Sequence, residues 1–200
     1  MKYKTIKSTS QSKITIKGSK FLGFAYPVES SEEIESILHD TRKKYYDATH
    51  HCYAWQLGNG NDMTFRYNDD GEPSGTAGKP IYGAIQRLDL THVLIISIRY
   101  YGGTKLGTGG LIRAYGQSAS DTLDAAKIKT VEIGDTINFT CSYEQHPIIL
   151  RVVNQYHLIN LEQNFTEDIN INIEIDENDT NKIIDEIKNA TNGKIIGKIL

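Results

Sequence analysis

Hydrophobic and polar positions along the first 50 residues switch between the two-residue period of strands and the longer period of helices. Residues 3–7 and 13–17 alternate, which predicts two strands that form a hairpin. A third strand is expected over residues 21–28. Ser30 and Glu33 have the spacing of a capping box, so a helix is expected to begin there.

The middle of the chain alternates apolar segments with two loops rich in turn-forming residues. The elements predicted here are strands over 51–57, 63–67 and 93–98, and a helix from Pro80 through Leu88. The strand over 93–98 is continuously apolar and β-branched, which is typical of a central strand buried on both faces. The loops cover residues 68–80 and 102–110, and the second leads into a helix with regularly spaced apolar positions.

The pattern and the charge both change near residue 135. Residues 1–134 carry 17 basic and 14 acidic side chains, a net charge of +3, whereas residues 135–200 carry 5 and 11, a net charge of −6. The second stretch has the order βαββαβ, the ferredoxin-like unit. Its expected elements are strands over 136–141, 158–165, 169–175 and 194–199 and helices over 145–156 and 179–190. We therefore predict an α+β protein of two domains, 1–134 and 135–200.

Composition limits the functions to be considered. No apolar run approaches the roughly 20 residues that span a bilayer, so no membrane partner is expected. Cys52 and Cys141 are far apart in the sequence, which favours a reducing compartment, and we expect a cytoplasmic protein. A nucleic-acid partner would meet the basic first half, although the sequence pI near 6.1 is far from that of a dedicated nucleic-acid-binding domain.

The segment 99–113 carries the strongest functional signal. Five glycines occur in the nine residues 102–110, between a buried strand and a helix. Free N–H groups at the start of that helix, with Lys105 and Arg113 nearby, favour an anion or phosphate site, while tight turns and close packing would explain the glycines equally well. Named nucleotide motifs are absent: a P-loop needs Lys where Thr108 stands.

The loop 68–80 contains Asp69, Asp70 and Glu72, yet it fits no catalytic or calcium motif. Position twelve of an EF-hand counted from Asn68 is Lys79 rather than Glu. Ser74 does not lie in the Gly-x-Ser-x-Gly pattern of hydrolases. We expect these carboxylates to cap neighbouring backbone N–H groups.

His50-His51-Cys52 resembles part of a metal site, but a strand would place only His50 and Cys52 on one face. Two ligands make a poor zinc site, so neither a metal nor a cofactor is expected. One imidazole is expected to hydrogen-bond the Gly-rich loops, with Cys52 in the core. Tyr100 and Tyr101 flank the glycines and could stack on bases or simply be rim aromatics.

Three segments together closely resemble the YigZ/IMPACT family. They are His50-His51-Cys52-Tyr53-Ala54, the run from Asp69 to Pro80 (DDGEPSGTAGKP), and the run from Arg99 to Leu111 (RYYGGTKLGTGGL). The resemblance covers essentially the whole chain. It implies a ribosomal-protein-like α/β sandwich similar to domain IV of elongation factor G, followed by a ferredoxin-like domain similar to its domain V.

The resemblance also implies a link to translation, because eukaryotic IMPACT proteins are translational regulators that bind a protein partner. It supplies no catalytic residue. Three functions stay open, in this order: binding to RNA or the ribosome, a protein-binding regulator, and an enzyme that uses the acidic loop 69–72 with His50. The residues expected to bind the anion are Lys79, Arg99, Gly102, Gly103, Lys105, Gly107, Gly109, Gly110 and Arg113. The residues expected to line the site are His50, His51, Asp69, Asp70, Glu72 and Ser74.

Overall fold

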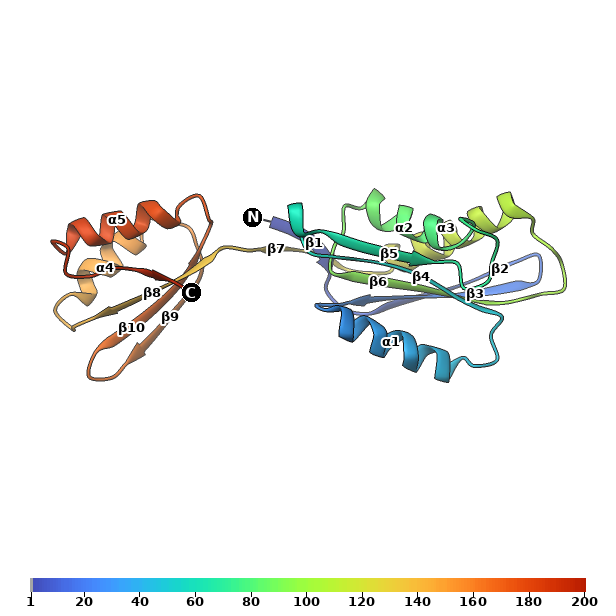
Figure 1. The fold of residues 1–200 in the computed structure, drawn as a ribbon, viewed down its shortest axis with the longest axis horizontal. Coiled ribbons are helices and arrows are strands. Elements are labelled where there is room, and N and C mark those ends of the chain that lie inside the picture. Colours follow the sequence, from blue (N-terminus) through green and yellow to red (C-terminus); the bar gives the residue numbers. More distant parts are fainter. Residues whose placement is uncertain (1) are drawn as a thin grey trace. The chain divides into compact units, whose positions relative to one another are not determined.

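The computed structural model describes residues 2–200, which form two compact units (Figure 1). The N-terminal unit contains residues 3–130, and the C-terminal unit contains residues 131–200 together with Lys2. Each unit combines helices with an antiparallel sheet and has its own hydrophobic core. The predicted α+β class is therefore confirmed.

A five-stranded antiparallel sheet forms the centre of the N-terminal unit, in the order β2-β3-β6-β4-β5. Its strands are β2 (Ser10–Ile16), β3 (Ser19–Pro27), β4 (His50–Leu57), β5 (Thr64–Asn68) and β6 (Val93–Tyr100). A short 3₁₀ turn, Gly60–Asp62, connects β4 to β5. The apolar run of β6 occupies the middle of the sheet, as its composition predicts.

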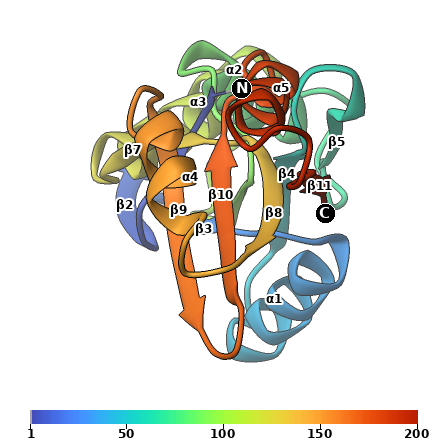
Figure 2. The same cartoon turned by 90° about the vertical axis from the view of Figure 1, so that its left-hand side faces the viewer.

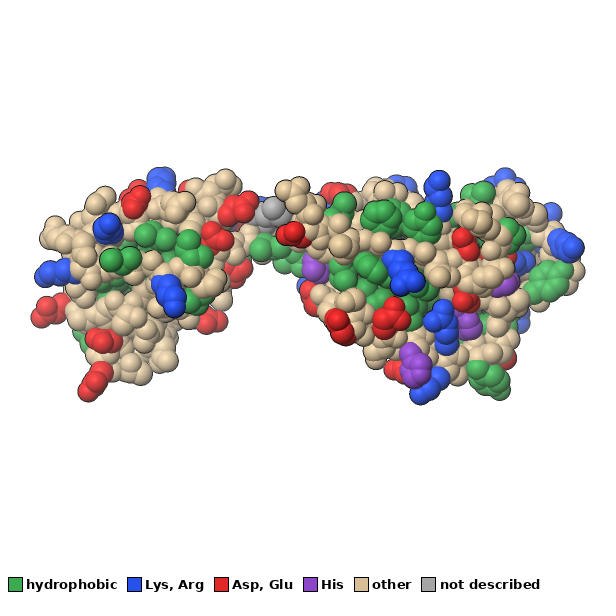
Figure 3. All heavy atoms as spheres, viewed as in Figure 1, with side chains coloured by type: hydrophobic (Ala, Val, Ile, Leu, Met, Phe, Trp, Pro, Cys, Tyr) green, Lys and Arg blue, Asp and Glu red, His purple; other side chains and the backbone are tan. Residues whose placement is uncertain are grey.

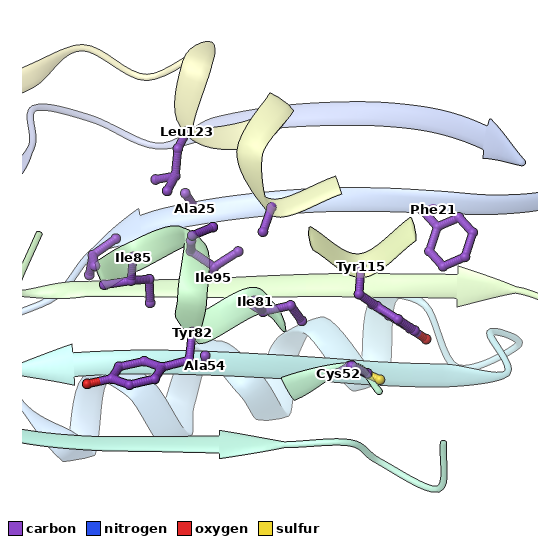
Figure 4. Packing of buried hydrophobic residues seen from close by; sticks show 14 of the residues in the cluster. Phe21, Ala25, Cys52, Ala54, Ile81, Tyr82, Ile85, Ile95, Tyr115 and Leu123 are labelled. Carbon is purple, nitrogen blue, oxygen red and sulfur yellow. The ribbon is translucent and has the colours of Figure 1, made fainter. Parts of the chain in front are cut away.

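Helices cover both faces of this sheet. Helices α2 (Gly78–Arg87) and α3 (Thr108–Asp124) lie on one face and α1 (Ser31–Lys44) on the other (Figure 1). Successive side chains of β6 point to opposite faces, so Ile95 packs with α2 and α3 while Ile96 packs with α1. Figure 4 shows the first of these cores, in which Phe21 and Tyr115 lie together at one end.

Helix α1 begins where the sequence predicts. The Ser30 hydroxyl accepts a hydrogen bond from the Glu33 N–H at 3.2 Å. The Glu33 carboxylate accepts from the Glu29 N–H instead of the Ser30 N–H that a capping box would use. The first contact satisfies an N–H group that the first helical turn leaves without a partner, and the second holds the backbone just before the helix.

The predicted hairpin of the first two strands is wrong. Strand β1 (Lys2–Ile6) pairs with β7 (Ile128–Glu132), a strand that the pattern did not predict, and β2 pairs with β3. The turn between β2 and β3 consists of Lys17 and Gly18, both with positive φ. Such two-residue turns match the twist of paired strands, and Gly in the second position is their usual signal.

The C-terminal unit has the ferredoxin-like order that the sequence predicts. Its elements are β8 (Asp135–Cys141), α4 (His146–Val153), β9 (Leu158–Phe165), β10 (Ile169–Ile175), α5 (Thr180–Ala190) and β11 (Lys198–Ile199). The sheet order is β11-β8-β10-β9 (Figure 2). The inward side chains of β8 and β10 pack with both helices. The last strand is two residues long rather than six, and the Asp179 side chain makes no capping bond to α5.

We expect the C-terminal unit to fold without the rest of the chain. Its core of buried residues is formed entirely by residues of this unit. Expressed alone, residues 136–200 should show cooperative thermal unfolding, and limited proteolysis of the whole protein should cut within 130–138. Independent folding of this unit would be contradicted by two results together. The fragment would show no ordered structure by circular dichroism, and the protease would cut the whole protein only outside residues 130–138.

Candidate functional site

Three strand ends bring polar side chains together on the face that carries α3. Arg99 on β6 lies opposite Phe21 of β3 on one side and opposite His50 of β4 on the other. Because side chains two residues apart share a face, Ser19 and Cys52 point to the same side of the sheet as these residues. The strand pattern thus places His50 and Arg99 next to each other.

Arg99 forms a buried ion pair with Glu72. The Arg99 Nη1 donates to the Glu72 Oε1 at 2.6 Å, and the two side chains are only 6% and 4% exposed. The Tyr115 hydroxyl donates to the same carboxylate oxygen at 2.7 Å, and the Arg99 Nη2 donates to the Ser19 hydroxyl at 3.2 Å. The charge of Arg99 is therefore compensated within the protein, and Glu72 fixes the loop 68–80 to the sheet.

Two neighbouring groups stay protonated because they are buried. Burial raises the pKa of the Tyr115 hydroxyl, and the adjacent Cys52 and Glu72 raise it further. Burial likewise raises the pKa of the Cys52 thiol, whose S–H donates to the Asp69 carbonyl at 3.0 Å. A nucleophilic cysteine needs a thiolate, so Cys52 serves the core here (Figure 4).

The carboxylates of Asp69 and Asp70 accept hydrogen bonds from backbone N–H groups. The Asp69 carboxylate accepts from the N–H groups of Gly75, Ala77 and Gly78, which orders the loop and caps the start of α2. The Asp70 carboxylate accepts from the His51 N–H at 2.7 Å and from Arg42 at 3.3 Å. For these two residues the expected capping of backbone N–H groups is what the structure shows.

The two histidines have different surroundings. His50 Nδ1 is 2.8 Å from the Asp70 carbonyl, and its Nε2 lies 3.7 Å from Glu72 Oε1. His51 points to the opposite face and bonds the Tyr45 carbonyl at 3.0 Å. Only His50 therefore faces the buried ion pair.

The glycines of 102–110 have different roles. Gly102 packs against the backbone of Gly18, and a Cβ on it would lie 1.9 Å from the Gly18 carbonyl carbon. Gly107 is the N-cap of α3 with φ of 70°, a conformation that L side chains rarely adopt. Helix α3 starts at Thr108, so Gly109 and Gly110 lie within its first turn.

A cavity of about 440 Å³ opens beside the ion pair. It contains five of the predicted site residues, namely His50, Glu72, Arg99, Lys105 and Gly107. The rest of its lining was not predicted from the sequence. It comprises Thr49, Pro73, Leu106, Thr108, Leu111 and the flanking aromatic Tyr101.

The other predicted residues lie outside this cavity. Gly110 and Arg113 line a neighbouring hollow together with Lys17 and Leu106. A second hollow on the other side is lined by Lys13, Lys20 and Tyr101. The remaining predicted residues that line neither the cavity nor these hollows are His51, Asp69, Asp70, Ser74, Lys79, Gly102, Gly103 and Gly109.

Leu106 and Tyr101 join the cavity to the two hollows, so one continuous surface carries Lys13, Lys17, Lys20, Lys105 and Arg113, all of them exposed. We call these five residues the cationic face. Figure 3 shows Lys and Arg side chains gathered at that end of the N-terminal unit, at the right of the view. The sequence does contain a signal for Lys13, Lys17 and Lys20. The Lys17-Gly18 turn predicts a β2–β3 hairpin, and that hairpin carries all three lysines.

Among residues 2–200, no cluster of three or more His, Cys, Asp or Glu side chains is arranged to hold a metal ion. Within the same residues, none of the helices has both the length and the apolar character needed to cross a membrane.

Comparison with known proteins gives consistent matches over both units. Residues 17–123 match the Impact N-terminal domain, and residues 139–194 match a domain of unknown function (DUF1949). The IMPACT family member YvyE of Bacillus subtilis is 31% identical over 192 residues, covering 96% of this chain and 88% of that protein. The Protein IMPACT homolog of Dictyostelium discoideum is 38% identical over 103 residues, covering 50% of this chain and 29% of that protein.

A solved structure described as a hypothetical protein covers 100% of this chain and 97% of its own, with a TM-score of 0.68 at 23% identity. This similarity supports the fold.

Proposed function

Because the chain belongs to the IMPACT family, we propose that it is a binding protein of the translation apparatus that contacts RNA through the cationic face. The family contains eukaryotic members, and the resemblance of the three motifs implies a role in translational regulation. RNA binding by this chain, and its cytoplasmic location, are parts of the proposal.

The observation that carries the proposal is the continuity of the cationic face. Five exposed basic side chains lie along the cavity and its two neighbouring hollows, and the acidic side chain that shares these hollows is Asp47. The acidic loop opposes this charge less than its composition suggests, because Glu72 is paired with Arg99 and Asp70 contacts Arg42. An excess of exposed positive charge on one surface is the usual footprint of a phosphate-backbone contact.

Two of the residues predicted to bind the anion, Arg99 and Lys79, are not part of the cationic face. Arg99 is engaged with Glu72, and Lys79 lies on α2 outside the cavity and both hollows. Lys17 and Lys20 take their places in the proposed contact, beside Lys105 and Arg113. Four phosphate contacts with single-stranded RNA correspond to a slope of log K against log[salt] of about −3.

Reversing two charges should weaken RNA binding strongly. In the variant Lys105→Glu with Arg113→Glu, two contacts are lost and repulsion replaces them. The affinity for a mixed-sequence single-stranded RNA should fall at least ~10-fold at low salt, and the slope should approach about −1.4. Filter binding over a salt series, with RNA and with ribosomes, measures both quantities.

The matched control is Lys127→Glu with Lys129→Glu, which changes the net charge equally at exposed positions outside the cationic face. It should bind nearly as well as the unchanged protein. Salt-independent binding, or equal loss in both double variants, would argue against the cationic face.

A protein-binding role has one observation of its own. Phe65 and Tyr67 on the edge strand β5 are 51% and 41% exposed, and both stack near Tyr82. Exposed aromatic side chains on a free sheet edge are typical of surfaces that bind an extended segment of another protein. Failure of the RNA-binding test would move this function to first place.

The enzymatic alternative is the least supported of the three. It uses Asp69, Asp70 and Glu72 as acid–base groups with His50, but Asp69 accepts three backbone N–H groups and Asp70 is bonded to His51 and Arg42. Glu72 is held by Arg99 and Tyr115. These carboxylates all have structural partners.

A further inference from the structure

The cavity beside the buried ion pair has the size of a small-ligand site. Its volume of about 440 Å³ lies within the range of pockets that enclose a small molecule. Its walls differ in chemistry: one contains Glu72, Arg99 and His50, another contains Lys105 and the start of α3, and apolar surface comes from Pro73, Tyr101, Leu106 and Leu111. This combination suits a ligand with an anionic group and a flat apolar part.

The start of α3 provides the anion-binding part of the cavity. The first N–H groups of a helix have no partner within it. Gly107 at the N-cap has no side chain to accept from them, and the first turn contains no acidic residue. Thr108 and Lys105 line the cavity at this position, so free N–H groups and an ammonium group converge there.

Arg99 supplies a second, independent indication of a ligand. Its side chain is 6% exposed and lines the cavity, yet its Nε has no hydrogen-bond partner among residues 2–200. Buried polar groups are rarely left unsatisfied in proteins, and those that are often mark functional sites. The cavity lining therefore includes a cation with spare hydrogen-bonding capacity.

Tyr101 provides the flat apolar surface. The residue is 47% exposed, and its ring lies against the Arg99 guanidinium, whose central carbon is 5.5 Å from the ring centroid. The guanidinium packs against one side of the ring. The rest of the ring forms an aromatic surface at the edge of the cavity. Aromatic side chains of this kind stack on nucleobases with little dependence on sequence.

We propose that this cavity binds one nucleotide, with its phosphate at the start of α3 beside Lys105 and its base against Tyr101. The inference rests on the proposed RNA-binding function and assigns the cavity to a single unstacked nucleotide of the RNA. Tyr101 and Leu106 also line the hollows of the cationic face, so the neighbouring phosphates of the same strand meet Lys17, Lys20 and Arg113.

The test uses the full chain and cytidine monophosphate as the probe. Titration followed by two-dimensional NMR should shift the amide signals of Thr108, Gly109 and Gly110 together with that of Tyr101. Cytidine without phosphate and inorganic phosphate without a base should each bind at least ~10-fold more weakly, because each lacks one of the two contacts.

Variants separate the two contacts. Tyr101→Ala should weaken cytidine monophosphate binding about 10-fold through lost stacking. Lys105→Gln should weaken it about 10-fold through a lost charge-assisted hydrogen bond. The matched controls are Tyr46→Ala, at a tyrosine that is 83% exposed away from the cavity, and Lys43→Gln on α1. Both controls should bind as the unchanged protein does.

The outcomes distinguish this inference from the proposed function. If inorganic phosphate binds as tightly as the nucleotide, or if cytidine monophosphate leaves the amide signals unchanged, the nucleotide site is wrong. In that case, RNA binding could still be lost when the charges of Lys105 and Arg113 are reversed and stay unchanged in Tyr101→Ala. That result would support RNA binding by the cationic face without the nucleotide site. Nucleotide binding without RNA binding at low salt would refute the proposed function and leave a small-ligand site.

Discussion

Replacing Arg99 by methionine should lower the free energy of unfolding of the N-terminal unit by about 3–5 kcal/mol. The substitution removes the guanidinium and leaves the Glu72 carboxylate, which is 4% exposed, buried with one neutral donor from Tyr115. A buried charge without its counterion is among the most destabilising changes in a protein. Methionine keeps much of the side-chain volume, so the loss reports mainly on the charge.

The chain's single tryptophan, Trp55 on β4, reports on this unit alone. Urea denaturation followed by its fluorescence gives the free energy of unfolding of each variant. The double variant Arg99→Met with Glu72→Leu should recover much of the loss, because it removes both charges at once. A loss below about 1 kcal/mol for Arg99→Met would show that water reaches the ion pair and screens it.

Regular elements were predictable where the hydrophobic pattern was strong. The apolar run 93–98 gave the central strand β6, and the alternation of 169–175 gave β10 with its inward isoleucines. One pairing prediction failed because alternation identifies a strand but says nothing about its partner. The Lys17-Gly18 turn would have joined β2 to β3 instead.

The candidate site was predictable only in part. The two-residue period places His50 and Cys52 on one face, and the structure adds Arg99 to that face through the register between β4 and β6. An arginine at the end of a strand, before a glycine-rich turn, has the appearance of a phosphate ligand in the sequence. Its actual partner, Glu72, comes from a loop whose path depends on the bonds of Asp69 to three backbone N–H groups.

The glycines show the same limit of sequence reasoning. Five glycines before a helix predict either close packing or free N–H groups for a ligand, and the sequence does not separate the two. The structure separates them by position. Gly102 packs against the β2–β3 turn, whereas a Cβ on Gly109, at the start of α3, would meet Arg113 Nη1 at an ordinary contact distance of 3.7 Å.

Gly102→Ala should therefore lower the free energy of unfolding of the N-terminal unit by about 3 kcal/mol, at the upper end of the cost of overpacking. The new Cβ would lie 1.9 Å from the Gly18 carbonyl carbon and 2.2 Å from the Ser19 nitrogen. Both neighbours are backbone atoms of the β2–β3 turn, so no side-chain rotation relieves the clash. Relief requires movement of the hairpin or of the segment after β6.

Gly109→Ala is the matched control from the same glycine-rich segment. The nearest atom to its Cβ within 4 Å is Arg113 Nη1, at 3.7 Å, and the position is helical. Alanine restricts the unfolded chain more than glycine does, so this variant should be more stable by about 0.4–1 kcal/mol. Urea denaturation with Trp55 fluorescence compares the two. Equal effects of the two substitutions would contradict a packing role that is specific to Gly102, because both replace one glycine by one methyl group.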